Sequence, residues 1–365
     1  MKDRYQIDGH KLVFHPRRVA DLLEAKGDWE KAKHVYPIYV EMSPMGACNH
    51  RCVFCAYDYV GYKTNTIPLE TFAVRMPEMG RLGVKSIMLA GEGEPMLHKD
   101  ITEIVKIIKG SGIDVSFTTN GSILPRGFIE EALPLVSWIK CSMNAGTAET
   151  YAKVHRTKAE HFEQTIEHLT AFARARRERN LSVTLGAQIL LLPENAAEVG
   201  RLAEICRDRI GLDYLVVKPY SHVERSLTQA YKNLDYEQFM EMEQALKKFN
   251  TDRFSVVFRA NTMRKWMSDD RYSHCYSVPM LWAHIIASGE VHGCGAFILD
   301  ERFQYGNLNE KSFQEIWEGE KRRVGFEFVT HELDITECRK NCRMDEVNHY
   351  LYRLIDDPPG HVNFI

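Results

Sequence analysis

The sequence of 365 residues lacks the features that would direct it to a membrane, to secretion or to nucleic acid. No uninterrupted apolar run approaches the roughly 18 residues that a membrane helix needs. The start, MKDRYQIDGHKLVF, contains no apolar segment of the secretory type. Lys and Arg number 47 against 50 Asp and Glu, so the net charge of -3 produces no field that attracts polyanions. We expect a cytoplasmic protein with no nucleic-acid partner and no membrane partner.

Repeats and low-complexity segments are also absent, and the composition is that of a globular protein. Hydrophobic residues make up 44% and charged residues 27%, which is enough apolar material for a sizeable core. A basic run, Arg174–Arg179, has no aromatic residues to stack bases, so we interpret it as a solvated helix face. Nine cysteines are many for a cytosolic chain, where disulfides are rare. They favour metal or redox chemistry.

Short apolar segments alternate with helical patterns through the first two thirds of the chain. Such alternation predicts parallel strands joined by right-handed crossovers. Six strand–helix units, rather than eight, predict an α/β fold of the partial (βα)6 TIM-like barrel type, with its active face at the carboxyl ends of the strands. The expected strands are Pro37–Met42, Val84–Ala90, Asp114–Thr119, Trp138–Ser142, Ser182–Leu190 and Tyr214–Lys218. The expected helices are Arg17–Ala32, Leu69–Leu82, Asp100–Gly110, Gly127–Leu133, Phe162–Arg179 and Asn195–Arg209.

The rhythm changes near residue 235. A single amphipathic helix is expected at Tyr236–Phe249 and a strand at Phe254–Arg259, followed by a cysteine-bearing segment, Tyr272–Arg343. We therefore expect an N-terminal extension at 1–36, a barrel domain at 37–235 and a small α+β domain at 236–365.

The strongest local signal is a C-x3-C-x2-C motif formed by Cys48, Cys52 and Cys55, directly after the first expected strand. Three thiolates on one loop can bind three irons of a [4Fe–4S] cube and leave the fourth iron open. A structural zinc site would need a fourth protein ligand. His50 could supply one, although its position between two of the cysteines is cramped.

This motif, with an aromatic residue (Phe54) before its last cysteine, resembles that of the radical S-adenosylmethionine (SAM) enzymes. The resemblance implies that S-adenosylmethionine chelates the open iron, and that an electron from the reduced cluster cleaves it to a 5′-deoxyadenosyl radical. The radical abstracts hydrogen from a substrate. Flavodoxin or ferredoxin is the expected electron donor.

The same resemblance assigns cofactor contacts in the next strand-end segments. Ala90-Gly-Glu-Gly-Glu-Pro95 is similar to the family's Gly-Gly-Glu segment, with Ala90 in place of the first glycine. It implies that Gly91 and Glu92 bind the cofactor's amino group, with Glu94 as a second candidate carboxylate. Asn120, in Thr-Thr-Asn-Gly, is a further candidate, although Asn-Gly is equally a common turn.

Polar residues after the fourth and fifth strands complete the expected cofactor site. Ser142, Asn144 and Arg156 resemble family positions that contact the ribose and the carboxylate of the cofactor. Helix capping and a surface position are the alternatives for these three residues. Gln188, on the fifth strand, is expected to face the same pocket.

Three residues are catalytic candidates. Lys218 and Tyr220, in the polar segment after the sixth strand, are expected to contact the substrate, with a structural turn at Pro219 as the alternative. Cys141 could donate hydrogen to a substrate radical, as an epimerase requires, although core packing is the commoner role of a strand cysteine. Cys206, on a helix, is expected in the core.

Four cysteines form a second group, which consists of Cys275, Cys294, Cys338 and Cys342. Cys275-x13-Gly289-x4-Cys294 resembles the opening of the SPASM extension of many radical SAM enzymes, and Gly289 is expected to form a hairpin turn. Only Cys338-x3-Cys342 follows, so the resemblance implies the shorter twitch form with one auxiliary [4Fe–4S] cluster. A Zn(Cys)4 site is the alternative.

A fully ligated auxiliary cluster has no iron for a substrate, so its expected role is electron transfer or structural. A substrate radical next to oxygen or nitrogen is strongly reducing and could pass an electron to it. The 47 residues before Cys48 are short for a cobalamin or leader-peptide domain. We therefore expect an oxidoreductase acting on a small polar molecule, namely a sugar, a nucleotide sugar or an aminocyclitol. A radical epimerase or mutase, a peptide-modifying or maturase enzyme, and a zinc-binding module are the alternatives.

Overall fold

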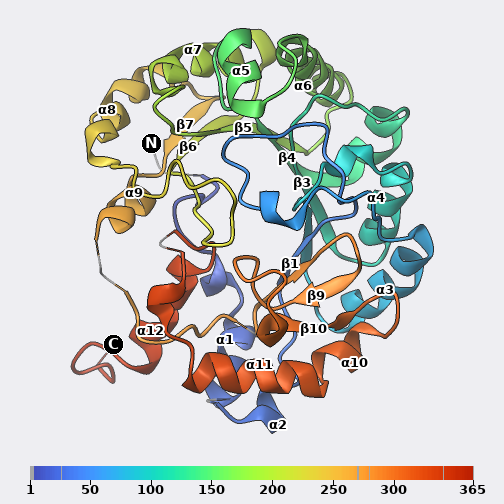
Figure 1. Ribbon diagram of the computed structural model, residues 1–365, viewed down its shortest axis with the longest axis vertical. Coiled ribbons are helices and arrows are strands. Elements are labelled where there is room, and N and C mark those ends of the chain that lie inside the picture. Colours follow the sequence, from blue (N-terminus) through green and yellow to red (C-terminus); the bar gives the residue numbers. More distant parts are fainter. Residues whose placement is uncertain (1–3, 26, 269–270, 279, 340, 365) are drawn as a thin grey trace.

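The computed structural model describes residues 4–25, 27–268, 271–278, 280–339 and 341–364. One ten-stranded sheet curves through the centre, and helices cover its outer face (Figure 1). Its strand order is β10-β9-β8-β1-β2-β3-β4-β5-β6-β7, and each neighbouring pair from β8 to β7 is parallel. The expected α/β partial barrel is therefore confirmed.

The six strands expected from the sequence form the middle of this sheet in chain order. Two of them, β3 and β6, have the expected bounds, and the others differ from expectation by one or two residues at an end. Buried Val, Ile, Leu and Phe fill the layer between the sheet and the helices, as parallel strands covered by helices require. The six strands are β1 (Tyr39–Met42), β2 (Ser86–Leu89), β3 (Asp114–Thr119), β4 (Val136–Ser142), β5 (Thr184–Leu190) and β6 (Tyr214–Lys218).

The sheet continues past residue 235, where the sequence suggested a domain boundary. Strand β7 (Ser255–Phe258) pairs in parallel with β6, and β8 (Trp282–Ile285) pairs in parallel with β1 at the other edge. Both edges of the six-stranded barrel are therefore extended by the last third of the chain. Hydrogen bonding of open sheet edges, which local sequence patterns do not report, explains this difference.

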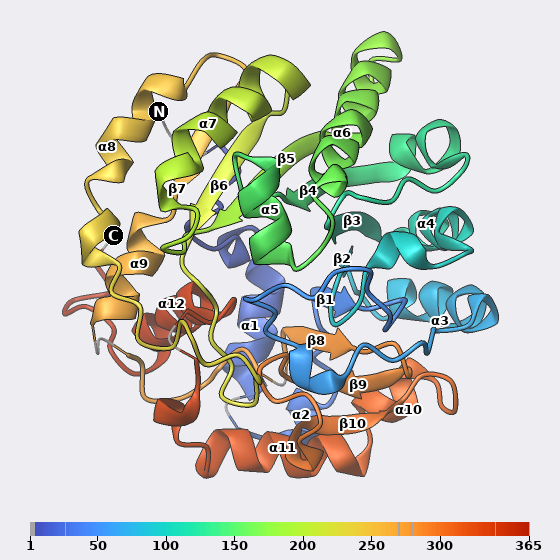
Figure 2. The same ribbon diagram turned by 45° about the horizontal axis from the view of Figure 1, so that its top comes forward.

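Helices lie between the strands close to their expected positions (Figure 2). The exceptions are one additional helix, α5 (Ala148–His155), and two π-helical segments, Phe128–Ala132 and Ile205–Ile210, in place of expected helix or helix end. The helix expected at Tyr236–Phe249 is instead a series of short pieces around α8. The helices are α3 (Leu69–Arg81), α4 (Ile101–Gly110), α6 (Glu160–Glu178), α7 (Val199–Glu204), α8 (Met242–Leu246) and α9 (Ala260–Met267).

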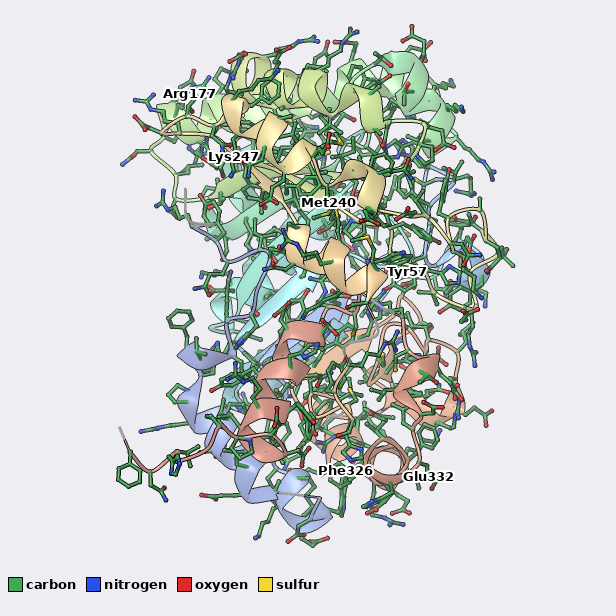
Figure 3. The ribbon with its side chains drawn as sticks, turned by 90° about the vertical axis from the view of Figure 1, so that its left-hand side faces the viewer. Tyr57, Arg177, Met240, Lys247, Phe326 and Glu332 are labelled. Atoms are coloured by element: carbon green, nitrogen blue, oxygen red, sulfur yellow. The ribbon has the colours of Figure 1, made fainter. Side chains whose placement is uncertain are left out.

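Two segments from opposite ends of the chain pack together on one side of the barrel. Helices α1 (Pro16–Ala25) and α2 (Trp29–Ala32) share an apolar cluster with α11 (Glu320–His331) and α12 (Asp345–Ile355). A single helix was expected for the first pair, but Gly27 has a φ of 80° and Asp28 caps α2, so the chain turns between them. Figure 3 shows Phe326 and Glu332 at the opposite end of the molecule from Arg177 and Lys247.

The C-terminal part of the sheet is an antiparallel hairpin, as expected from the Gly289 motif. Strands β8 and β9 (Glu290–His292) pair antiparallel, and β10 (Gln304–Asn307) continues the hairpin. Gly289 has a φ of 88°, and a Cβ there would lie 2.5 Å from side-chain atoms of Asn307 and Asn309. Among the described helices, none is long and apolar enough to cross a bilayer.

Replacing Gly289 by alanine should destabilise the hairpin, because a side chain there meets both a left-handed backbone and two amides. We expect Gly289→Ala to lower the free energy of unfolding by about 1–3 kcal/mol, measured by thermal or denaturant unfolding. Gly110→Ala is the control, because Gly110 is helical and a Cβ added to it would have nothing within 4 Å. An equal effect in both variants would contradict this account.

Candidate functional site

The first cysteine group lies on the loop that follows β1, at the carboxyl end of the barrel. Cys48, Cys52 and Cys55 are all unpaired as disulfides and only partly exposed. The loop is held by backbone hydrogen bonds from Arg51 and Val53 to the end of α5. Three thiols are thus presented together from one short loop, as a three-cysteine cluster site requires.

Burial stabilises the protonated form of these thiols unless a cation is bound beside them. It raises the pKa of Cys48 to about 12, and the neighbouring carboxylate of Glu94 adds to the effect. The pKa of Cys52 is also raised well above its usual range, first by burial and then by the other two cysteines. Thiolates in such surroundings are stabilised by a bound metal, so the site fits an iron–sulfur cluster.

Two histidines lie beside the central cysteine. Ligand atoms of His50, Cys52 and His155 lie within 4.8 Å of one another, and His155 Nδ1 is 3.2 Å from Cys52 Sγ. Burial lowers the pKa of His155 to about 4, and its Nε2 lies 3.1 Å from the carbonyl oxygen of Met143. A neutral His155 therefore donates to Met143 and holds the Cys52 side of the loop in place.

The segment after β6 is fastened over this loop by Asp58. Its carboxylate accepts hydrogen bonds from the backbone N–H groups of Leu227 and Thr228, at 2.8 and 3.0 Å, and from the hydroxyl of Ser226 at 3.0 Å. The Ser226 hydroxyl also lies 3.3 Å from the carbonyl oxygen of Cys55. The cysteine loop and the segment that covers it thus form one unit.

The second cysteine group converges from three separate segments. Cys275, Cys294, Cys338 and Cys342 line one small cavity of about 20 Å³. Burial raises the pKa of Cys294 to about 12, with Cys342 as the next cause. The Asn348 amide donates to Cys275 Sγ at 3.5 Å, and the Met344 backbone N–H donates to Cys342 Sγ at 3.4 Å. Four thiols around one buried space fit the complete ligand set of one cube.

The expected cofactor residues Gly91 and Glu92 lie where β2 ends. Gly91 has a φ of 135°, and a Cβ there would come within 2.6 Å of the Ser43 side chain. The Glu92 carboxylate is 4% exposed, and one oxygen accepts from the Ala287 backbone N–H at 2.7 Å. Its other oxygen has no hydrogen-bond partner among the described residues. An unsatisfied buried carboxylate oxygen fits a ligand ammonium group.

Three other expected contacts already have protein partners. Both oxygens of Glu94 are occupied, by Thr119 Oγ1 at 2.6 Å and by the Asn120 backbone N–H at 2.7 Å. The Asn120 side chain donates to Asn49 at 2.8 Å, and Asn144 Oδ1 accepts from the Leu190 backbone N–H at 2.8 Å. In this conformation these side chains support the strand-end loops rather than offer free groups to a ligand.

Ser142 and Gln188 face each other across β4 and β5. Gln188 Nε2 donates to Ser142 Oγ at 2.8 Å, and Gln188 Oε1 is buried without a partner among the described residues. Arg156 ends α5 with a φ of 46° and shares a surface hollow with Arg51 and Cys52. These three positions are therefore compatible with the expected ligand contacts.

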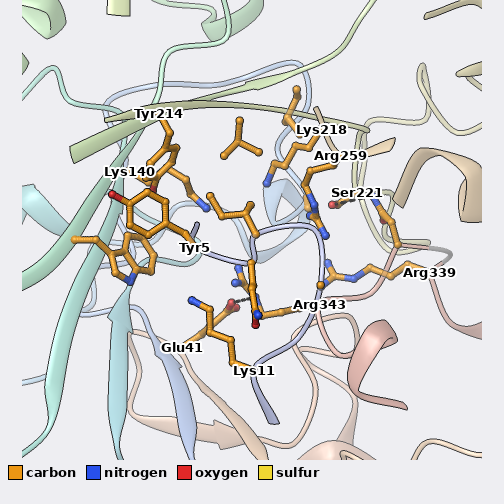
Figure 4. A pocket seen from close by; sticks show the side chains of 18 of the residues that line it. Tyr5, Lys11, Glu41, Lys140, Tyr214, Lys218, Ser221, Arg259, Arg339 and Arg343 are labelled. Atoms are coloured by element: carbon orange, nitrogen blue, oxygen red, sulfur yellow. Dashed lines mark hydrogen bonds and ion pairs between the residues drawn. The ribbon is translucent and has the colours of Figure 1, made fainter. Parts of the chain in front are cut away.

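A central cavity of about 430 Å³ lies inside the curved sheet (Figure 4). Phe54, Ala56 and Tyr57 of the first cysteine loop line it, and so do Arg339 and Asn341 of the second cysteine segment. The rest of the wall comes from the N-terminal segment between Tyr5 and Lys11, from the strands β1, β4, β5 and β6, and from Ser221, Arg259 and Arg343. A small molecule in this cavity would lie between the two cysteine groups, within the size range of ligand pockets.

Strand alternation decides which expected catalytic residues reach this cavity. Trp138 and Lys140 on β4, and Val216 and Lys218 on β6, line it. The side chain of Cys141 points to the opposite face of β4, where it is fully buried, and a Cβ at Gly121 would lie 2.7 Å from its sulfur. Tyr220 is also fully buried and is outside the described lining of the cavity. Of the three catalytic candidates, the structure brings only Lys218 to the cavity.

Several cavity residues were not expected from the sequence. Lys140 could have been found from the period of two along β4, since it alternates with Cys141. Glu41 could have been found in the same way on β1. Arg259, Arg339 and Arg343 carry no local signal, because only pairing of distant segments brings them to the wall.

Together the fold and the two cysteine groups define an iron–sulfur protein with a cysteine triad at the carboxyl end of a parallel barrel. The family model described as the Radical SAM superfamily matches residues 42–206, and the SPASM model, an iron–sulfur cluster-binding domain, matches residues 275–343. The chain therefore contains a radical SAM domain and a SPASM-type iron–sulfur domain, as its two groups of cysteines predicted. It is thus an enzyme whose cofactors are S-adenosylmethionine and [4Fe–4S] clusters.

Curated relatives are similar to this chain over part of their length. A GTP 3′,8-cyclase of Chlorobaculum tepidum is 27% identical over 185 residues, which cover 50% of this chain and 54% of the relative. A probable GTP 3′,8-cyclase of Thermococcus kodakarensis is 30% identical over 171 residues, which cover 43% and 52%. The chain spans about half the length of the curated relatives it matches.

Solved structures share the fold. Streptococcus suis SuiB bound to precursor peptide SuiA aligns with a TM-score of 0.66 at 16% identity, covering 92% of this chain and 75% of that chain. The anSMEcpe protein with bound AdoMet aligns with a TM-score of 0.57 at 14% identity, covering 88% and 97%. At these identities the similarity shows the fold alone.

Removing one cysteine from each group should separate the two clusters. We expect about eight irons per chain in anaerobically reconstituted protein, and about four in Cys52→Ala and in Cys294→Ala, because each variant lacks one ligand of one cube. Cys206→Ala, in the core, is the control and should retain about eight. Iron and sulfide analysis gives the counts, and a full complement in either ligand variant would contradict the assignment.

Proposed function

We propose that this enzyme oxidises a small polar molecule by radical chemistry in the central cavity. The substrate is a hydroxylated compound such as a sugar, a nucleotide sugar or an aminocyclitol. The observation that carries the proposal is the position of the cavity, which has residues of both cysteine segments in its wall. A substrate bound there is next to the site of hydrogen abstraction and next to an electron acceptor.

The residues of the chain divide the reaction between them. Cys48, Cys52 and Cys55 would hold the cluster that binds S-adenosylmethionine, and this cofactor would supply the abstraction of one hydrogen atom from a substrate carbon. Cys275, Cys294, Cys338 and Cys342 would hold a cluster that could accept one electron from that carbon, and the hydroxyl on the carbon would lose one proton. The C–O bond becomes a carbonyl, and the product has two hydrogens fewer than the substrate.

The proton acceptor that the wall offers is Lys140. Its pKa is lowered to about 7, first by burial and then by Arg343 and Arg259, while Glu41 opposes the shift. The ammonium lies 5.5 Å from the centre of the Trp138 ring. An amine with a pKa near neutrality is partly unprotonated at pH 7, and it can accept the substrate's proton.

The alternatives are supported less well by the geometry. An epimerase needs a hydrogen donor in the cavity, and Cys141 faces the other side of its strand. SuiB, whose solved structure contains a bound precursor peptide, shares the fold of this chain, and the curated relatives are named as GTP cyclases. A peptide and GTP therefore belong in the substrate screen.

The substrate screen tests the proposed reaction. Reconstituted enzyme with flavodoxin or dithionite should release 5′-deoxyadenosine when the substrate is added, with a product about 2 Da lighter. Cys52→Ala should release none, whereas Cys294→Ala should still cleave the cofactor and form little product. The reaction is also run in deuterated water. A product with the oxidation state of the substrate and with deuterium on carbon would contradict oxidation and indicate epimerisation.

The rate of product formation should depend on pH through Lys140. Only the unprotonated amine accepts a proton, so the rate should be low at pH 6, half-maximal near pH 7 and highest above pH 8. Lys140→Met should lower the rate about 10²-fold or more and remove this rise. Lys321→Met, on the exposed face of α11, is the control. The same pH profile in Lys140→Met and wild type would exclude Lys140 as the acceptor.

A further inference from the structure

The wall of the central cavity is strongly basic, unlike the chain as a whole. Six basic side chains line it, and Glu41 is the acid among the lining residues. Lys218 and Arg259 project from neighbouring elements toward the same space as Arg339, as Figure 4 shows. The six are Lys11, Lys140, Lys218, Arg259, Arg339 and Arg343.

Two of these cations have acidic partners within the protein. Arg343 forms an ion pair with Glu41. Arg259 Nε lies 3.3 Å from a carboxylate oxygen of Asp8, whose other oxygen accepts from the Asn261 backbone N–H at 3.0 Å. These acids are therefore committed to residues beside the cavity.

The remaining cations lack such partners in the described parts of the chain. Neither Lys140 nor Lys218 forms an ion pair there, and Arg339 Nε is buried without a hydrogen-bond partner. The pKa of Lys218 lies well below its usual value, first because of burial and then because of Lys140 and Arg259. Buried like charges destabilise one another unless an anion joins them.

A hydroxyl and an amide lie beside these cations. Ser221 lines the cavity, and its Oγ lies 3.3 Å from the Asn341 amide nitrogen, which leaves the hydroxyl proton available for an acceptor. The same amide donates to the Tyr220 carbonyl oxygen at 2.8 Å. Lys218, Arg259, Arg339 and Ser221 together present the donors that a phosphoryl or carboxylate group accepts from.

We propose that the cavity binds a substrate with an anionic group, either phosphoryl or carboxylate, held by Lys218, Arg259 and Arg339. This inference rests on the proposed function and narrows its substrate class to phosphorylated, nucleotide-linked or acidic molecules. An uncharged sugar or aminocyclitol offers no anionic group to Lys218 and Arg339, which form no ion pair among the described residues, whereas Arg259 is already paired with Asp8.

Inorganic phosphate and malonate test the site without a known substrate. Each is titrated into the reconstituted holoenzyme with S-adenosylmethionine, at constant ionic strength set by NaCl. Phosphate or malonate should raise the Tm above that in chloride alone, and the larger shift identifies the preferred group. Lys218→Met should bind that anion about ten- to a hundredfold more weakly. Lys321→Met, whose side chain is exposed on α11, should bind as the wild type does.

The variant carries its own folding control. Without an added anion, Lys218→Met should melt no lower than the wild type, because the substitution removes a repelled buried charge. No anion-specific rise in the wild type, or an undiminished rise in Lys218→Met, would overturn the anion site. A different result would contradict the proposed function, namely that the enzyme releases no 5′-deoxyadenosine with any compound of the substrate screen. A neutral substrate that is oxidised by an enzyme without phosphate or malonate binding would leave the function standing and the anion site refuted.

Discussion

The buried carboxylate of Glu41 is the interaction that joins the parts of this enzyme. It lies on β1, directly before the first cysteine loop, and pairs with Arg343, the neighbour of Cys342. His284 Nδ1 on β8 lies 3.3 Å from its other oxygen. Burial alone would raise the pKa of Glu41, but Arg343 and His284 outweigh it, and the pKa lies well below its usual range.

This contact also explains how the two cysteine groups come to face one cavity. Strand β8 pairs with β1 in parallel, and β9 runs back antiparallel to β8, so Cys294 lies level with the amino end of β8, whereas Cys48 follows the carboxyl end of β1. Arg343 then fixes the end of the second cysteine segment over the barrel. The central cavity therefore has residues of both cysteine segments in its wall.

Charge gives the cavity its second property. The chain has a net charge of -3, yet its lumen gathers six cations around one acid. Local concentration of charge in an enclosed space is more informative about a ligand than the overall charge, because low-dielectric walls focus the field. Burial, and after it the charges of Arg343 and Arg259, lower the pKa of Lys140 to about 7. The proposed anion binding and the proposed proton transfer thus involve neighbouring side chains of one cavity wall.

The period of two along the strands accounts for what sequence patterns predicted well and poorly within the barrel. The alternation along β4 predicts that Lys140 faces the cavity and that Cys141 faces the layer of helices. The full burial of Cys141 confirms the second placement. Chemical type alone made Cys141 the more attractive candidate. For Lys218, both the polar side chain and its place at the end of β6 predicted a position in the site. The structure places Lys218 on the cavity wall.

The amino-acid sequence by itself determined the two cysteine motifs, the strands from β1 to β6 and the Gly289 hairpin, because each depends on spacing within a short segment. Only the tertiary structure decided the addition of β7 and β8 to the sheet, the burial of the second cysteine group around a small cavity, and the basic lining of the central cavity. Those features depend on pairing between segments far apart in the chain. Edge hydrogen bonds and buried ion pairs select that pairing, and no local pattern records it.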